Sequence, residues 1–306
     1  MDSKTKLFLD AIRHNRDSGA SQLASDGLKL LLEVATKTVE NRDKNPLKVV
    51  GRVAKSLMDV RPSMAPVGNW ALLFYKEFEK LFADESVTNR AVDIENLSSR
   101  IFSRKGEINS LIVDAAKPVM KDLKSILTLS YSSTVERISL EAAPDGLKII
   151  VAESRPLCEG RKLVSSLLDA GRKVLCIMDA QIALEMSHVD MVLLGADTIC
   201  SDLAVINKTG SYLAALAARE YGIPLMVAAD TFKINHKVTS ATVVLEDKPG
   251  KEIWESRPEV CSNIYFEPVP AKLVTCFITE KGKLASDEMA GEVENLRRLY
   301  EETLFS

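Results

Sequence analysis

The chain has 306 residues, of which 46% are hydrophobic and 27% are charged, a composition typical of a globular protein with room for two domains. Its 40 basic and 43 acidic residues give a formal net charge of −3, which excludes a general attraction to nucleic acid. The first residues contain no apolar signal core, and no apolar run reaches membrane-spanning length. We therefore expect a cytoplasmic protein that neither crosses a membrane nor binds nucleic acid directly.

Residues 1–117 are predicted to form a helical N-terminal domain. Apolar residues recur every three or four positions, as in amphipathic helices, beginning with a helix over residues 27–39. A long charged helix is predicted from residue 86 to residue 116. We interpret the apolar and aromatic stripes as packing faces rather than cofactor contacts. They include Leu28, Leu31, Leu32, Ala35, Trp70, Phe74 and Phe78.

Residues 118–306 are predicted to form a doubly wound, mostly parallel Rossmann-like α/β domain. Short apolar runs alternate with helical segments, and runs that are apolar on both faces are typical of parallel strands covered by helices on two sides. A final amphipathic helix contains Met289, Val293, Leu296 and Leu299. The predicted strands cover residues 126–129, 148–152, 173–178, 191–194, 225–229, 241–245 and 274–278.

The same sequence excludes several cofactor sites. No G-x-G-x-x-G fingerprint follows the first strand and no Walker A sequence is present, so dinucleotide and P-loop chemistry are not expected. The five cysteines lack the close spacing of a zinc site, which indicates a reducing compartment and no metal. Cys176 and Cys276 lie in apolar runs and are expected to be buried.

Polar residues follow the strands at the positions where open α/β sheets bind ligands. Asp197 comes directly after the strand over residues 191–194, and Asn207 and Lys208 are predicted to open the next helix, where an anion binds well. Lys208 is expected to be solvated when no ligand is bound. The alternative is that the aspartate only forms a turn and the lysine is a solvated surface residue.

The second predicted strand also ends in a polar loop. The guanidinium group of Arg155 suits a phosphate or carboxylate, and Gly160 permits close approach at the start of the next helix. The alternative is an ion pair between Arg155 and Glu153 or Asp197. After the first strand, the hydroxyl of Ser132 and nearby backbone N–H groups open another helix.

Three sequence blocks occur in an order that points to one family. They are Gly195–Ile199 (GADTI), Ile206–Ser211 (INKTGS) and Pro224–Lys233 (PLMVAADTFK). Together they resemble the signature of the family that joins the alpha, beta and delta regulatory subunits of initiation factor 2B, methylthioribose-1-phosphate isomerase and ribose-1,5-bisphosphate isomerase. The resemblance covers essentially the whole chain and is most secure over residues 121–283.

The resemblance implies roles for individual residues. The aspartate that matches Asp197 takes part in catalysis in the isomerases. The isomerases also use a cysteine in a Thr-His-Cys segment, and Ser130 stands in its place here. The ligand-binding residues implied by the resemblance are Gly19, Ala20, Arg61, Ser132, Arg155, Gly160, Asn207 and Lys208.

Two departures from the isomerase pattern bear on activity. A thiol, with a reference pKa of about 8.5, can supply a thiolate near neutral pH. The hydroxyl of Ser130 needs an activating base, which the preceding Leu129 does not provide. The isomerase Arg-Gly-Ala matches Ser18–Ala20, so its arginine is absent, and the segment from Arg61 is closer to the initiation-factor subunits. Cys200 is either a substitute thiol or an ordinary loop cysteine.

The sequence therefore predicts an initiation factor 2B-like protein of the regulatory type, which binds a sugar phosphate or nucleotide without isomerase turnover. The alternative is an aldose–ketose isomerase that uses Asp197 on ribose 1,5-bisphosphate or methylthioribose 1-phosphate. A third interpretation is a structural assembly subunit with an empty crevice. The resemblance also implies a homodimer or larger homo-oligomer through the α/β domain, and an initiation-factor-type protein partner. No cofactor is expected.

Overall fold

The computed structural model describes residues 2–15, 20–60, 64–83, 90–245 and 247–304. Its chain divides into two compact units. The first unit contains Met1–Glu107, Phe232–Ile234 and Glu294–Ser306, and the second contains Ile108–Thr231 and Asn235–Val293. The division between the units thus falls before residue 117, and the first unit also includes two segments from later in the chain.

The first unit is built from helices, as the apolar stripes predict. The helices are α1 (Ser3–His14), α2 (Ala20–Glu40), α3 (Pro46–Val60) and α4 (Ala65–Ala83), with parts of α5 (Arg90–Met120) and α10 (Ser286–Leu304). One face of each helix is buried, for example Leu28 and Leu31 of α2 and Phe74 and Phe78 of α4. No helix in the described part of the chain is both long and apolar enough to cross a membrane.

The side chain of Asn69, in α4, ties later segments to the first unit. Its Nδ2 donates to the carbonyl oxygens of Phe232 at 2.6 Å and Ile234 at 2.8 Å. Its Oδ1 accepts from the hydroxyl of Tyr300 at 2.9 Å, and the ring of Trp70 stacks on Phe232 with centroids 3.9 Å apart. These buried contacts explain why residues 232–234 and the end of α10 belong to this unit.

Replacing Asn69 by alanine is expected to lower the free energy of unfolding by about 3 kcal/mol, because two carbonyl oxygens and a buried hydroxyl lose their partner. Urea unfolding followed by circular dichroism measures the change. Asn295→Ala is the control, since Asn295 is exposed and its side chain accepts a hydrogen bond from Arg298, three residues along the same helix. The control should change stability by less than about 0.5 kcal/mol, and a similarly small loss at Asn69 would contradict the assignment.

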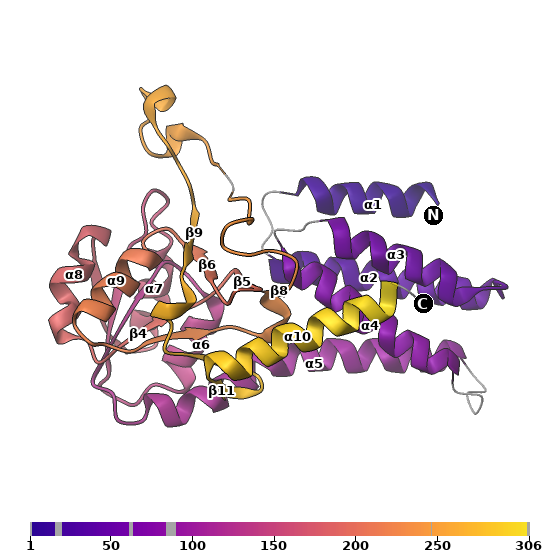
Figure 1. The fold of residues 1–306 in the computed structure, drawn as a ribbon, viewed down its shortest axis with the longest axis horizontal. Coiled ribbons are helices and arrows are strands. Elements are labelled where there is room, and N and C mark those ends of the chain that lie inside the picture. Colours follow the sequence, from indigo (N-terminus) through magenta and orange to yellow (C-terminus); the bar gives the residue numbers. More distant parts are fainter. Residues whose placement is uncertain (1, 16–19, 61–63, 84–89, 246, 305–306) are drawn as a thin grey trace. The chain divides into compact units, whose positions relative to one another are not determined.

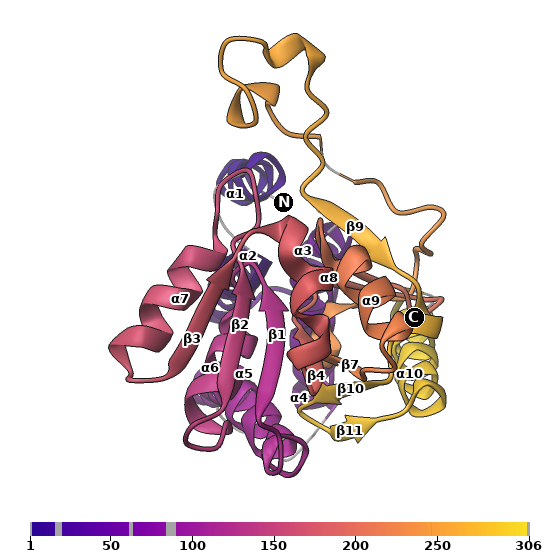
Figure 2. The same ribbon diagram turned by 90° about the vertical axis from the view of Figure 1, so that its left-hand side faces the viewer.

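The second unit contains a seven-stranded sheet in the order β11-β10-β7-β4-β1-β2-β3 (Figure 2). Neighbouring strands are parallel except β10 and β11, which confirms the predicted doubly wound, mostly parallel fold. The strands are β1 (Ser125–Leu129), β2 (Lys148–Ala152), β3 (Lys173–Ile177), β4 (Met191–Leu194), β7 (Leu225–Ala228), β10 (Cys276–Thr279) and β11 (Gly282–Leu284).

Helices cover this sheet, which is why its central strands are apolar on both faces. Strands β1, β4, β7 and β10 are buried along their whole length, whereas the edge strand β3 is partly exposed. Helix α7 packs on β2 and β3, and α9 packs on β4. Helix α6 packs on α7, and α8 packs on α9. The helices are α6 (Ser133–Glu141), α7 (Gly160–Asp169), α8 (Ile182–Glu185) and α9 (Ser211–Glu220).

A second, smaller sheet was not predicted. Its order is β8-β5-β6-β9, with β5 (Thr198–Cys200), β6 (Val205–Lys208), β8 (Ile234–Asn235) and β9 (Phe266–Val269). The predicted strand over residues 241–245 is wrong, because that segment is a turn followed by irregular chain. Its apolar side chains Val243 and Leu245 pack against the buried cluster of Cys200, Ala204 and Ile206, so the pattern reflects packing rather than strand pairing.

Residues 247–264 form a projecting arm just before β9 (Figure 1). The arm contains two 3-10 turns, Gly250–Glu252 and Pro258–Val260, and it is closed by a bridge between Asp247 and Ile264. Asn263 braces it by donating from Nδ2 to the carbonyl oxygen of Pro249 at 3.0 Å. The last residue of the arm leads directly into Tyr265 and β9, which positions the base of the arm beside the end of β6.

Candidate functional site at the strand ends

The order of the main sheet places a switch point between β1 and β4. The chain proceeds from β1 to β2 and β3 on one side, and from β4 to β7 and β10 on the other. Ligands in open α/β sheets bind at the carboxyl ends of the strands at such a point. The loops that follow β1 and β4 touch here, because a Cβ atom built on Gly195 would lie 2.5 Å from Oγ of Ser132.

Two predicted site residues lie in these touching loops. Ser132 caps α6 and accepts a hydrogen bond from the N–H of Val135 at 3.4 Å. Asp197 is exposed two residues after Gly195, and its N–H donates to the carbonyl oxygen of Ile206 at 2.9 Å. The backbone of Asp197 is thereby tied to β6, the strand that ends in Asn207 and Lys208.

Ser130, which the resemblance matches to the isomerase cysteine, is buried directly after β1. Its backbone has φ of 62°, and its N–H donates to the carbonyl oxygen of Ala152 at the end of β2, at 3.2 Å. The preceding Leu129 is also buried. A hydroxyl next to an apolar side chain cannot become a nucleophile or base without help from another group.

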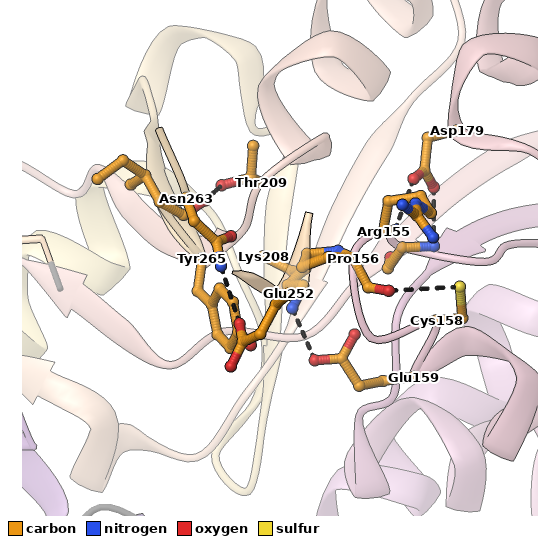
Figure 3. Close-up of polar contacts among 12 residues, drawn as sticks. Arg155, Pro156, Cys158, Glu159, Asp179, Lys208, Thr209, Glu252, Asn263 and Tyr265 are labelled. Carbon is orange, nitrogen blue, oxygen red and sulfur yellow. Dashed lines mark hydrogen bonds and ion pairs between the residues drawn. The ribbon is translucent and has the colours of Figure 1, made fainter. Parts of the chain in front are cut away.

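The loop between β2 and α7 is fixed by its neighbours on both sides (Figure 3). The carboxylate of Asp179 accepts the N–H groups of Ser154 and Arg155, each at 2.8 Å. Glu153 is bound by Arg161 at 2.6 Å, and among the described residues no ion pair joins Glu153 to Arg155. The residue Arg155 itself is exposed at this loop.

Gly160 marks a close approach of backbone to backbone at the start of α7. A Cβ atom at this position would lie 2.3 Å from the carbonyl oxygen of Ala152 and 3.0 Å from Cα of Glu153. Real Cβ atoms do not reach such distances, so only glycine fits. Its role in the structure is therefore to let α7 begin directly against the end of β2.

Lys208 ends β6 and is buried, which corrects the expectation that it is solvated and opens a helix. Its Nζ lies 2.6 Å from Oε1 of Glu159 and 4.0 Å from the centre of the Tyr265 ring (Figure 3). The Tyr265 hydroxyl donates to Glu252, which also accepts from Nδ2 of Asn263 at 2.8 Å. Burial, followed by the bond to Glu252, raises the pKa of Tyr265 well above its ordinary value.

The helix that follows β6 is α9, and its N-terminus already holds an anion. Gly210 precedes the helix with φ of 107°. The carboxylate of Glu267, on β9, accepts the N–H groups of Gly210 at 2.7 Å and Tyr212 at 2.9 Å. Asn207, predicted to begin this helix, instead lies in β6 and donates from Nδ2 to Oγ of Ser211 at 2.9 Å. Both groups predicted to attract a phosphate, the lysine and the helix N-terminus, thus contact glutamates.

These two glutamates are the residues that sequence reasoning missed. Glu159 stands next to Gly160 in a polar stretch, but nothing local indicates that it reaches Lys208, 49 residues away. Glu267 faces Asn207 in the pairing of β6 with β9, which follows only from an antiparallel register between distant segments. The position of Glu267 could have been predicted only from the pairing of β6 with β9.

The remaining predicted ligand-binding residues belong to the first unit. Ala20 is the first residue of α2. Gly19 and Arg61 lie outside the residues that the structure describes. Their predicted contribution to the ligand site stays a prediction.

Cys200, in β5, does not provide a substitute thiol. Cys200 is fully buried there, and burial raises the pKa of its thiol to about 12. Cys276 is buried as expected, but Cys176 is exposed because β3 is an edge strand. All five cysteines are free, and no group of three or more His, Cys, Asp or Glu residues within the described ranges could hold a metal ion.

A doubly wound α/β sheet with polar loops meeting at its switch point defines the class of α/β proteins that place a small-molecule site at the strand ends. Within this class, the chain belongs to the initiation factor 2 subunit family, which matches residues 16–286. The family expected from the GADTI, INKTGS and PLMVAADTFK blocks is therefore confirmed.

The relatives include proteins named for each of the two predicted functions, an initiation factor subunit and a sugar-phosphate isomerase. A Pyrococcus horikoshii protein described as putative translation initiation factor eIF-2B subunit 2-like is 30% identical over 278 residues, covering 90% of this chain and 94% of its own. Ribose 1,5-bisphosphate isomerase of Archaeoglobus fulgidus is 28% identical over 287 residues, covering 90% and 88%. The crystal structure of the Pyrococcus horikoshii translation initiation factor eIF-2B matches with a TM-score of 0.71 and 29% identity, covering 94% and 98%.

Proposed function

We propose that this chain is a regulatory-type member of its family that binds a phosphorylated small molecule at the strand ends without isomerising it. The observation that carries the proposal is the serine at position 130, which stands where the isomerases have a cysteine. Its neighbour Leu129 is buried and apolar, so it cannot activate the hydroxyl.

The state of Cys200, the thiol considered as a substitute for the isomerase cysteine, supports the absence of turnover. Isomerisation of a sugar phosphate moves hydrogen between neighbouring carbons and needs an acid and a base on the substrate. Cys200 is buried and its pKa of about 12 keeps it protonated at neutral pH. Loss of one acid–base partner typically lowers the rate by about two to four orders of magnitude.

The proposed ligand class rests on two cations beside the loop that follows β2. Arg155 is exposed on the loop after β2, and Glu159 of that loop contacts Lys208 at the end of β6. A planar guanidinium and an ammonium group suit the oxygens of a phosphate. Ser132 and Asp197, in the touching loops after β1 and β4, offer a hydroxyl and a carboxylate for the hydroxyl groups of a sugar.

The second candidate function is isomerase activity on a pentose phosphate. It is favoured by the exposed carboxylate of Asp197 at the switch point and by the isomerase named among the relatives. Under this alternative Asp197 acts as the acid or base, with an unconventional partner in place of the cysteine.

One assay separates the two functions. Purified protein is incubated with ribose 1,5-bisphosphate or methylthioribose 1-phosphate, and ketose formation is followed by NMR. We expect no ketose above the rate without protein, together with a rise in melting temperature caused by ligand binding. Ketose formation that Asp197→Asn abolishes and that the exposed surface control Asp145→Asn retains would establish the isomerase. No thermal shift with either sugar phosphate would instead favour the structural assembly subunit.

We further propose that the protein acts in the cytoplasm as a homodimer or larger homo-oligomer paired through the α/β unit, with an initiation-factor-type protein as a partner. The five free thiols support a reducing compartment. The arm supports pairing, because it exposes large apolar side chains that a monomer leaves in water. They are Ile253, Trp254, Val260 and Ile264.

A further inference from the structure

The ion pair between Lys208 and Glu159 is asymmetric in its access to water. The Lys208 side chain is 5% exposed, held between β6 and the Tyr265 ring, whereas the Glu159 side chain is 31% exposed at the edge of its loop. The carboxylate can therefore reach solvent by rotating its side chain, but the ammonium group cannot. Of the two partners, only Glu159 can leave.

Glu159 is also only half satisfied where it lies. Its Oε1 accepts from Lys208, but its Oε2 is buried and has no hydrogen-bond partner among the residues that the structure describes. A buried acceptor without a donor is unfavourable relative to the same oxygen in water. Rotation into solvent would restore hydration to that oxygen, so the lost contact with Lys208 is partly offset.

The surrounding backbone does not depend on this side chain. Glu159 precedes α7 but its carboxylate does not cap the helix. The loop is held instead by backbone bonds from Cys158 N–H to Ser154 at 2.9 Å and from Gly160 N–H to Glu153 at 3.0 Å. A change of rotamer at Glu159 would thus leave the loop and the start of α7 in place.

We propose that Glu159 is an internal competitor, a carboxylate that occupies Lys208 until the phosphate of a ligand displaces it. The proposal rests on the phosphate-binding function proposed above and identifies the residue that sets its affinity. Displacement keeps Lys208 paired throughout, because one anion replaces another. A phosphate monoester carries more charge and more acceptor oxygens than a carboxylate, which is why it can win Lys208 from Glu159.

The N-terminus of α9 is not part of this exchange. The Glu267 carboxylate there accepts two backbone N–H groups, at 2.7 Å and 2.9 Å, and so is held at both. The proposal therefore places the incoming phosphate at Lys208 and leaves the helix cap intact.

The experiment measures binding of inorganic phosphate and ribose 5-phosphate by isothermal titration calorimetry to wild-type protein and Glu159→Gln. The neutral amide keeps the shape of the side chain but cannot match the charge of a phosphate. We expect Glu159→Gln to bind both probes at least about tenfold more tightly than wild type. Glu153→Gln is the matched control, because it removes the same charge from the same loop at a residue paired with Arg161. It should stay within about twofold of wild type.

Two further variants keep the test decisive. Glu159→Asp retains the charge on a side chain one methylene shorter, which holds Lys208 less closely, so affinity should rise by about threefold even if the glutamine variant folds poorly. The double variant Glu159→Gln with Lys208→Met should lose the gain entirely, because the site of exchange is removed. Thermal unfolding without ligand verifies that each variant is folded.

The outcomes distinguish this proposal from the proposed function. If wild type binds ribose 5-phosphate but Glu159→Gln binds no more tightly than Glu153→Gln, the proposal that Glu159 competes for Lys208 is overturned. The proposal that the protein binds a phosphorylated ligand then still stands. Weaker binding by Glu159→Gln would show that the carboxylate contacts the ligand, which also overturns the proposal that Glu159 competes. If no folded variant binds either probe, both proposals are overturned. Binding by Glu159→Gln alone would support the competitor, with the wild-type site held closed by its own glutamate.

Discussion

Replacing Lys208 by alanine is expected to lower the free energy of unfolding by about 3 kcal/mol. The side chain is almost fully buried, so truncation leaves a cavity where its stem packs. The variant also loses the ammonium group that lies 2.6 Å from Glu159 and 4.0 Å from the Tyr265 ring. Because Glu159 can turn into water, the loss stays below that of an ion pair whose second charge is trapped.

Two other substitutions divide this loss into its parts. Lys208→Met keeps most of the stem and removes the charge, so it should lower the free energy of unfolding by only about 1 kcal/mol. Lys162→Ala is the matched control, since Lys162 also lies over a tyrosine ring, at 3.8 Å from the centre of Tyr131, but is exposed. It should cost less than about 1 kcal/mol. Guanidinium unfolding measures all three, and equal losses at Lys208 and Lys162 would contradict a structural role for the buried lysine.

The main sheet could be predicted because its signal is local. Strands β1, β2 and β4 are runs of apolar residues bounded by turn formers, and burial on both faces leaves no polar alternation to confuse the pattern. The position of Asp197 at a strand end followed from the same pattern. Parallel strands then bring their carboxyl ends to one edge whatever the exact boundaries, so the loops of the site were predictable as a set.

The small sheet and its glutamates could not be predicted in the same way. Strands β5 and β6 have three and four residues, and β6 ends in two polar residues that equally suit the start of a helix. Burial of Lys208 depends on Glu159 and Tyr265, which come from separate segments. The cap on α9 comes from Glu267, 57 residues beyond Gly210. Such contacts are decided by tertiary pairing, on which propensity and periodicity carry no information.

Replacing Gly160 by alanine is expected to lower the free energy of unfolding by about 3 kcal/mol. Two effects oppose each other at this position. Alanine favours the helical conformation over glycine by up to about 1 kcal/mol. Its Cβ, however, would lie 2.3 Å from the carbonyl oxygen of Ala152, and this neighbour is backbone of a buried strand that cannot rotate away. The steric effect therefore outweighs the gain in propensity.

Gly291→Ala provides the matched control, because Gly291 lies in α10 and a Cβ there meets nothing within 4 Å. It should raise stability by about 0.5–1 kcal/mol, so the two variants are expected to change the unfolding midpoint in urea in opposite directions. If Gly160→Ala is as stable as wild type, α7 does not begin as close to β2 as the structure indicates. The shift of α7 that relieves this steric contact in Gly160→Ala would also move the carboxylate of the adjacent Glu159 relative to Lys208. Phosphate affinity in folded Gly160→Ala protein should therefore differ from wild type, whereas Gly291→Ala should leave it unchanged.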